Sequence, residues 1–228
     1  RGRSVEPATI LACHAALSHV SSAKTQECID ASTPLPERTA ASLIHACKEA
    51  FGQISSAKVL SCIQSAAESS GRGRPLEPAT IKACHDALSQ VSSAKTQECI
   101  ETSAPLPQRT AASIVRACKE AFGQTSSAKV LSCIRTAAES SERGRPLEPG
   151  TIKACHAALS PVSSAKTQEC IEASASLPQQ TAAFTVQSCR ESSGHIGSTA
   201  VVDCIRSAAA SSSQAHTGAP QRGPRKRD

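Results

Sequence analysis

The chain has 228 residues, with 25 Lys and Arg against 19 Asp and Glu, which gives a net charge of +6. Leu, Ile, Val and Phe together make up only 38 residues, about 17% of the chain, and Met, Trp, Tyr and Asn are absent. This composition excludes N-glycosylation and an apolar core of ordinary size, and no apolar run approaches the ~20 residues of a membrane span.

The sequence repeats with a period of 71 residues. Arg-Gly-Arg begins at residues 1, 72 and 143, and the first two copies differ at 16 of 71 positions. The third copy follows them closely to about Thr181 and then diverges. We therefore predict repeat units at 1–71, 72–142 and 143–210, followed by a basic disordered tail at 211–228.

Each unit begins with a predicted helical hairpin. The segment Glu6-Pro7-Ala8-Thr9 is typical of a helix start, with Pro in the first turn. Ile10, Cys13 and Leu17 then share one helix face. The pattern breaks at residues 18–21, and Ser21 or Ser22 is expected to cap the returning helix.

A second hairpin follows in each unit, after Pro34-Leu35-Pro36. Two apolar stripes, separated by Gly52-Gln53, consist of Leu43, Cys47, Ala50 and Phe51 and of Val59, Cys62, Ile63 and Ala66. The first cysteines of successive hairpins are 34 or 37 residues apart, the size of one helix-turn-helix unit in an α-solenoid. The predicted fold is all-α: six tandem disulfide-stapled αα-hairpins in a solenoid-like array.

The twelve cysteines follow the repeat, with steps of 15, 19 and 15 residues in each unit. Four cysteines allow three pairings, but those about seven residues before and eight after each turn lie opposite each other in an antiparallel hairpin. A disulfide needs Cα atoms within about 7 Å, and the many Ala and Ser residues permit this approach. We predict the pairs Cys13–Cys28, Cys47–Cys62, Cys84–Cys99, Cys118–Cys133, Cys155–Cys170 and Cys189–Cys204.

So many structural disulfides indicate an oxidising compartment, and we expect a secreted, extracellular protein. No leader segment is visible, and the chain reads as a mature or partial product. The bridges would offset the shortage of apolar core.

The sequence gives little support for metal-binding, redox, nucleophilic or phosphate-binding motifs. Cys-His occurs at 13–14, 84–85 and 155–156, but zinc would need a Cys₂His₂ or similar set in each unit, and the second hairpin has Lys48 or Arg190 after its cysteine. Neighbouring helical residues also point about 100° apart. There is no Cys-x-x-Cys redox motif, no Gly-x-Ser-x-Gly elbow and no phosphate-binding loop. We expect no metal, no cofactor and no enzymatic activity.

Basic residues gather in the Arg-Gly-Arg segments and in Pro224-Arg225-Lys226-Arg227. Such clusters can bind phosphate, but stacking aromatics are lacking and the pI is about 8.8, so nucleic-acid binding is not expected. The segments are interpreted as solvated joints, and proteolytic processing sites are the alternative.

Tandem disulfide-clasped helical hairpins resemble the cysteine-rich Sel1-like repeat proteins of bacteria. The stretch from Ala57 to Ile63, AKVLSCI, also resembles the cysteine-rich repeats of a Golgi-resident glycoprotein family. Each resemblance covers one hairpin, the cysteine spacing departs from both families, and the Gly and aromatic signatures of Sel1-like repeats are missing. Neither resemblance implies a function here.

Closely matched units favour a structural role, in which the protein self-associates or binds another extracellular protein as a rod, coat or filament. The divergent end of the third unit is then a cap or a subunit junction. The alternative is a binding scaffold for a protein or peptide. That reading expects the differences between copies to gather on one face, and several of them are Leu11/Lys82, Ala15/Asp86, His19/Gln90, Asp30/Glu101 and His45/Arg116.

Overall fold

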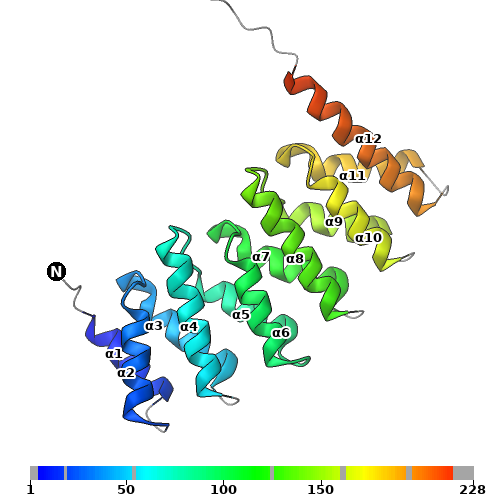
Figure 1. Cartoon of the computed structure of the whole chain (residues 1–228). Helices are drawn as coiled ribbons and strands as arrows, with labels where there is room; N and C mark the ends of the chain where they lie inside the picture. Colours follow the sequence, from blue (N-terminus) through cyan, green and yellow to red (C-terminus); the bar gives the residue numbers. More distant parts are fainter. Residues whose placement is uncertain are drawn as a thin grey trace, which may run out of the picture.

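A computed structural model describes residues 5–17, 20–52, 55–123, 126–159, 163–193 and 197–217. These residues form twelve helices and no strand, so the all-α hairpin array is confirmed (Figure 1). In chain order the helices are α1 (Pro7–Leu17), α2 (Ser22–Ser32), α3 (Glu37–Phe51), α4 (Ser56–Gly71), α5 (Pro78–Leu88), α6 (Ser93–Ser103), α7 (Gln108–Phe122), α8 (Ser127–Glu142), α9 (Pro149–Leu159), α10 (Ser164–Ser174), α11 (Gln179–Ser193) and α12 (Ser198–Thr217).

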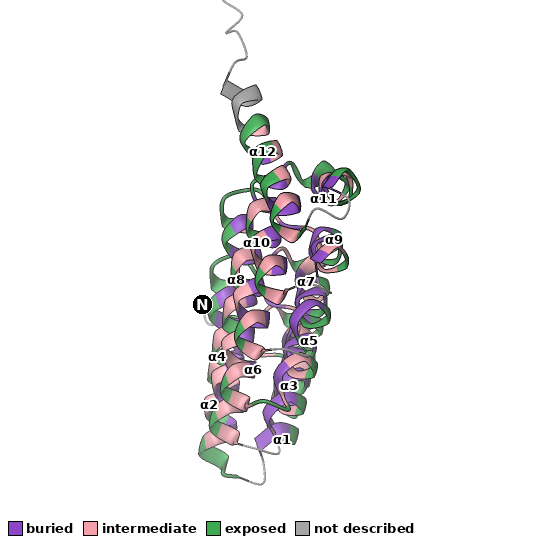
Figure 2. Ribbon diagram, turned by 90° about the vertical axis from the view of Figure 1, so that its right-hand side faces the viewer, coloured by how far each residue is buried: buried purple, intermediate pink, exposed green. Residues whose placement is uncertain are grey.

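The helices stack in two layers. Each odd-numbered helix packs on the odd-numbered helices before and after it, and the even-numbered helices form the second layer in the same way. Each hairpin contributes one helix to each layer, and Figures 1 and 2 show the resulting elongated array. Buried residues line the space between the layers and between successive hairpins, which is the arrangement of an α-solenoid.

Local sequence signals set the helix boundaries. Ser21 caps α2, because its side chain accepts a hydrogen bond from the backbone N–H of Lys24 at 3.2 Å, and Ser92 caps α6 in the same way through Lys95. The expected cap at Ser21 is therefore confirmed. The predicted breaks at 18–19 and at Gln53 lie outside the described residues.

Both predicted stripes of the second hairpin are buried. Phe51 and its counterpart Phe122 are fully buried, whereas Phe184 in α11 is 70% exposed. In the first hairpin Cys13 and Leu17 are buried, but Ile10 is only half-buried. The core therefore rests on a few branched side chains, on alanine and on cystine.

Six disulfides join the two helices of every hairpin, in the predicted pairing. Their Cα–Cα distances are 5.6–5.8 Å, shorter than the roughly 8–10 Å between the axes of packed helices. Small neighbours such as Ala12 and Ala16, both buried beside Cys13, allow this approach.

Among the described residues no helix is both long and apolar enough to cross a bilayer.

The junctions between units are ordered turns. Gly73 has φ +74°, its N–H donates to the carbonyl of Ser70, and the N–H of Arg74 donates to the carbonyl of Ser69. This is a Schellman motif, in which glycine takes the left-handed position that ends a helix. Gly144 closes the second junction identically, with φ +75°.

The C-terminal end differs from the sequence expectation. Helix α12 continues to Thr217, so residues 211–217 are helical and do not belong to a disordered tail. Position 211 corresponds to Ser69 and Ser140, and in the earlier units the same helix ends two residues later, at Gly71 and Glu142. Ala and Ser through this stretch continue the helix where the other units have the glycine turn. Residues 218–228 lie outside the described part of the chain.

The last hairpin presents a polar face at the end of the array. Thr185, Ser188 and Ser192 occupy the positions of Leu43, Ala46 and Ala50 in the first unit. In the first two units these positions are buried beneath the following hairpin, whereas in α11 all three are half-buried or exposed. Terminal repeats of solenoids need such a polar outer face. The sequence divergence in the third unit thus includes the face of α11 that no hairpin covers in the described part of the chain.

Candidate binding groove at the repeat junctions

The even-numbered layer is unevenly spaced. Helices α4 and α6, and likewise α8 and α10, contact each other less extensively than the even helices within one unit. The chain crosses each junction through a longer linker, since α4 ends at Gly71 and α5 begins at Pro78. The result is a groove in the even-numbered layer at each boundary between units.

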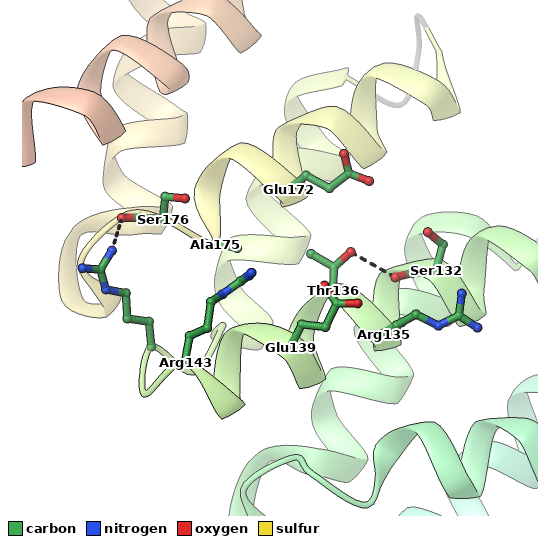
Figure 3. Close-up of a pocket in the computed structure, with 9 residues that line it drawn as sticks. Ser132, Arg135, Thr136, Glu139, Arg143, Glu172, Ala175 and Ser176 are labelled. Atoms are coloured by element: carbon green, nitrogen blue, oxygen red, sulfur yellow. Dashed lines mark hydrogen bonds between the residues drawn. The ribbon is translucent and has the colours of Figure 1, made fainter. Parts of the chain in front are cut away.

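The groove at the second junction has a volume of about 770 Å³. Helix α8 and the turn that follows it form one wall, and the end of α10 forms the other (Figure 3). Its lining is almost entirely polar: Ser132, Arg135, Thr136, Glu139, Arg143, Arg145, Glu172, Ala175 and Ser176.

Three arginines and two glutamates set the charge of this groove. Arg145 donates to the carbonyl oxygen of Ser176 at 3.4 Å, and Glu172 accepts a hydrogen bond from Gln168 at 2.9 Å. Within the described part of the chain, the Arg143 guanidinium has no hydrogen-bond or ion-pair partner. It is thus available to an acidic group on a ligand.

The first junction has a smaller version of the groove, of about 270 Å³. Its two arginines are already paired, Arg72 with Glu68 at 3.8 Å and Arg74 with Glu142 at 4.0 Å. Gln64 stands where the second junction has Arg135, so the two grooves differ in charge. Of these two grooves, the one at the second junction is larger, and its Arg143 is unpaired among the described residues.

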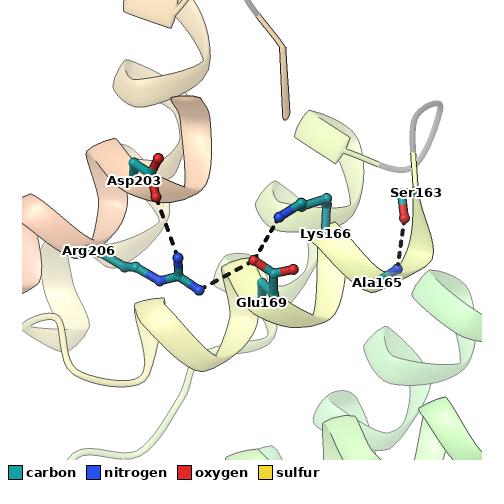
Figure 4. Close-up of polar contacts among 6 residues, drawn as sticks. All are labelled: Ser163, Ala165, Lys166, Glu169, Asp203 and Arg206. Carbon is teal, nitrogen blue, oxygen red and sulfur yellow. Dashed lines mark hydrogen bonds and ion pairs between the residues drawn. The ribbon is translucent and has the colours of Figure 1, made fainter. Parts of the chain in front are cut away.

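Ion pairs between even-numbered helices hold the arginine at the rim of this groove. Arg135 contacts Glu98 of α6 at 3.4 Å, and Lys95 contacts the same carboxylate at 2.7 Å. The third unit repeats this cluster with Lys166, Glu169 and Arg206, which Asp203 extends (Figure 4).

The charge cluster in the third unit lowers the pKa of one carboxyl group. A hydrogen bond from Lys166 to Glu169, at 2.9 Å, lowers the pKa of this carboxyl below its ordinary value, and the positive charges of Lys166 and Arg206 add to the effect. The carboxylate therefore stays ionised to lower pH than an isolated glutamate.

The cysteines predicted as site residues are all in disulfides, and eleven of the twelve are buried. Every sulfur is bonded to another sulfur, so the Cys-His pairs offer no thiolate to zinc. His14 is exposed while Cys13 is fully buried, which confirms that the two point apart. Among the described residues, no three His, Cys, Asp or Glu side chains come together as a metal site.

Two of the basic residues singled out in the sequence, Arg143 and Arg145, lie in the groove. Arg1, Arg3 and the Pro224–Arg227 segment lie outside the described residues. Sequence reasoning missed Arg135, Glu139 and Glu172. One signal was present, because Gln64/Arg135 and Ser65/Thr136 are adjacent differences between the first two copies.

Three of the four described variable positions are exposed in the odd-numbered layer, and the fourth is exposed in the other layer. Leu11 and Ala15 are exposed on α1, in the odd-numbered layer, and His45 is exposed on α3 of the same layer. Asp30 is exposed on α2, in the other layer, and His19 lies outside the described residues. Both a variable contact surface and sequence drift on exposed faces fit these positions.

The processing-site alternative remains a prediction. Arg72 and Arg143 are exposed, but each precedes a hydrogen-bonded turn. Ile81 and Ile100 of the second unit are fully buried next to the first unit. Cleavage at a junction would therefore leave the units packed together.

Comparison with known proteins assigns no family to the chain. No family model, no curated protein and no solved structure matches the sequence or the fold.

Proposed function

We propose that the protein is a secreted, non-enzymatic structural protein that acts as a stiff rod of defined length. The observation that carries the proposal is the presence of one disulfide in each of the six hairpins. Each bridge joins the two layers, and the stacked hairpins share one buried cluster from Ala12 to Ala209. Disulfides across the array and a continuous core along it are expected to make the array resistant to bending and to proteases.

The polar face of α11 favours a rod of fixed length over a filament. Head-to-tail growth would place the α11–α12 end of one molecule against the α1–α2 end of the next. Thr185, Ser188 and Ser192 take the place of the apolar residues that form this contact surface inside the array. Thr185 and Ser192 donate to carbonyl oxygens of their own helix, at 3.0 and 2.8 Å, so their hydroxyls are already paired. Stacking on this face would bury less apolar surface than the internal contacts do, which opposes head-to-tail growth.

Protein from the natural source tests this proposal. Treated with a thiol-alkylating reagent without reductant, it should take up no label, and electron microscopy should show unbranched particles of one length. Twelve reactive thiols would contradict a secreted, stapled protein. Particles of indefinite length that grow with concentration would contradict the fixed-length rod.

A binding scaffold is the second candidate, favoured by the groove at the second junction and its unpaired Arg143. Here the Arg143→Ala variant should lose at least tenfold in affinity for a partner carrying acidic groups. The matched variant Arg116→Ala changes an exposed arginine on α7, in the other layer, and should bind normally. A structural rod predicts that neither substitution changes its assembly.

A further inference from the structure

The N-terminal end of the array exposes a surface that is buried elsewhere in the molecule. Ile10 and Ile29 are half-buried, while all their counterparts in the second and third units are fully buried: Ile81, Ile152, Ile100 and Ile171. Val5 is likewise half-buried, while Leu76 and Leu147 are 6% and 4% exposed. The difference has one cause, since only the first unit lacks a preceding hairpin in the structure.

Polar groups on this surface also match those of the internal junctions. At the first junction the Lys58 ammonium donates to the Ser93 hydroxyl, and Gln97 donates to the Ser65 hydroxyl at 3.1 Å. At the second junction Lys129 donates to Ser164, and Gln168 donates to Thr136 at 3.3 Å. Such hydrogen bonds fix the register of one hairpin on the next.

The first unit carries an acceptor hydroxyl and a donor amide at the same two positions. Ser22 corresponds to Ser93, and Gln26 corresponds to Gln97. Both are exposed, and Gln26 keeps only the bond within its own helix, to Asp30 at 2.9 Å. The surface is therefore equipped for the same apolar and polar contacts as the internal interfaces.

We propose that this face of α1 and α2 docks a further helical hairpin of the kind formed by α3–α4 and α7–α8. The occupant presents a leucine or isoleucine and two alanines at the positions of Ile114, Ala117 and Ala121. It also supplies a lysine at the position of Lys129, to reach Ser22. The array is thus receptive at one end and closed at the other.

A second intact copy of the chain cannot provide the docking hairpin by stacking end to end. Its α3–α4 and α7–α8 faces are covered by the next hairpin, and its α11 face carries Thr185, Ser188 and Ser192 instead. The occupant is therefore a hairpin from another repeat unit of this type. Docking is independent of the mechanical role proposed above, because it depends only on the chemistry of the two faces.

Two extended chains test the inference. In one, residues 72–142 are joined ahead of Arg1; in the other, the same segment is joined after residue 210 in place of the native C-terminal segment. Hydrogen exchange of the α1 and α2 amides should slow at least tenfold in the first chain, to the rate of α5 and α6, and stay unchanged in the second. Equal exchange in both chains would overturn the proposal.

The Ile10→Asp substitution separates docking from general stabilisation. In the N-terminally extended chain it should abolish the slower exchange of α2, while in the natural chain, where Ile10 is half-buried, the exchange of α2 should change less than twofold. Sedimentation of the natural chain gives an independent result. A dimer that Ile10→Asp dissociates would show that a second copy occupies the face, and would overturn the assignment to a hairpin.

Discussion

Reduction of the disulfides should unfold the whole array. Each bridge closes a loop with a sequence separation of 15 residues. A loop of this size stabilises the folded state by about 3 kcal/mol, so six of them contribute roughly 18 kcal/mol. That exceeds the net stability of about 5–15 kcal/mol typical of a folded protein.

Circular dichroism at 222 nm measures this effect. The protein is incubated with a phosphine reductant under mild denaturant until twelve thiols are titrated, alkylated, and returned to buffer beside an unreduced sample treated in parallel. The reduced sample should lose most of its helical signal at 25 °C and show no cooperative thermal transition. Unchanged helicity and melting temperature would refute the view that cystine compensates for the small core.

Three further predictions concern single residues. Ile100→Ala should cost about 3 kcal/mol in urea unfolding, because it empties a fully buried site, whereas Ile29→Ala at the uncovered end should cost at least ~1 kcal/mol less; equal losses would mean that the first unit does not cover Ile100. Gly144→Ala should cost about 1 kcal/mol in the same assay, because φ is +75° there, and an unchanged unfolding midpoint would exclude strain at the junction. Lys166→Ala should raise the pKa of the Glu169 carboxyl toward its ordinary value in an NMR titration. Because folding lowers this pKa, the stabilisation is complete above the ordinary carboxyl pKa and disappears as the pH falls through the lowered one, and a titration unaffected by the substitution would exclude the hydrogen bond as its cause.

The hairpins and their bridges could be predicted because both depend on short-range spacing. Cys13 and Cys28 flank a turn almost symmetrically, so helix geometry alone brings them together. Ser21 caps α2 through Lys24, three residues away. Signals of this range are contained in a sequence window of one hairpin.

The groove could not be predicted in the same way. Glu139 and Glu172 come to line one space only because α8 and α10 are further apart than even helices within a unit. That spacing depends on how whole hairpins pack across a six-residue linker, which no local pattern specifies. The end of α12 at Thr217 was missed because Ala and Ser there replace the glycine turn without an obvious helix signal.

The matching faces of the internal hairpins have a consequence for how the gene can change. The face that α7–α8 presents to α9–α10 is nearly the same as the face that α3–α4 presents to α5–α6. In-frame gain or loss of one 71-residue unit by unequal recombination between copies would therefore recreate an existing interface and create no new one. The polar last hairpin stays at its end through such events, so the number of units can vary between alleles while each product remains folded.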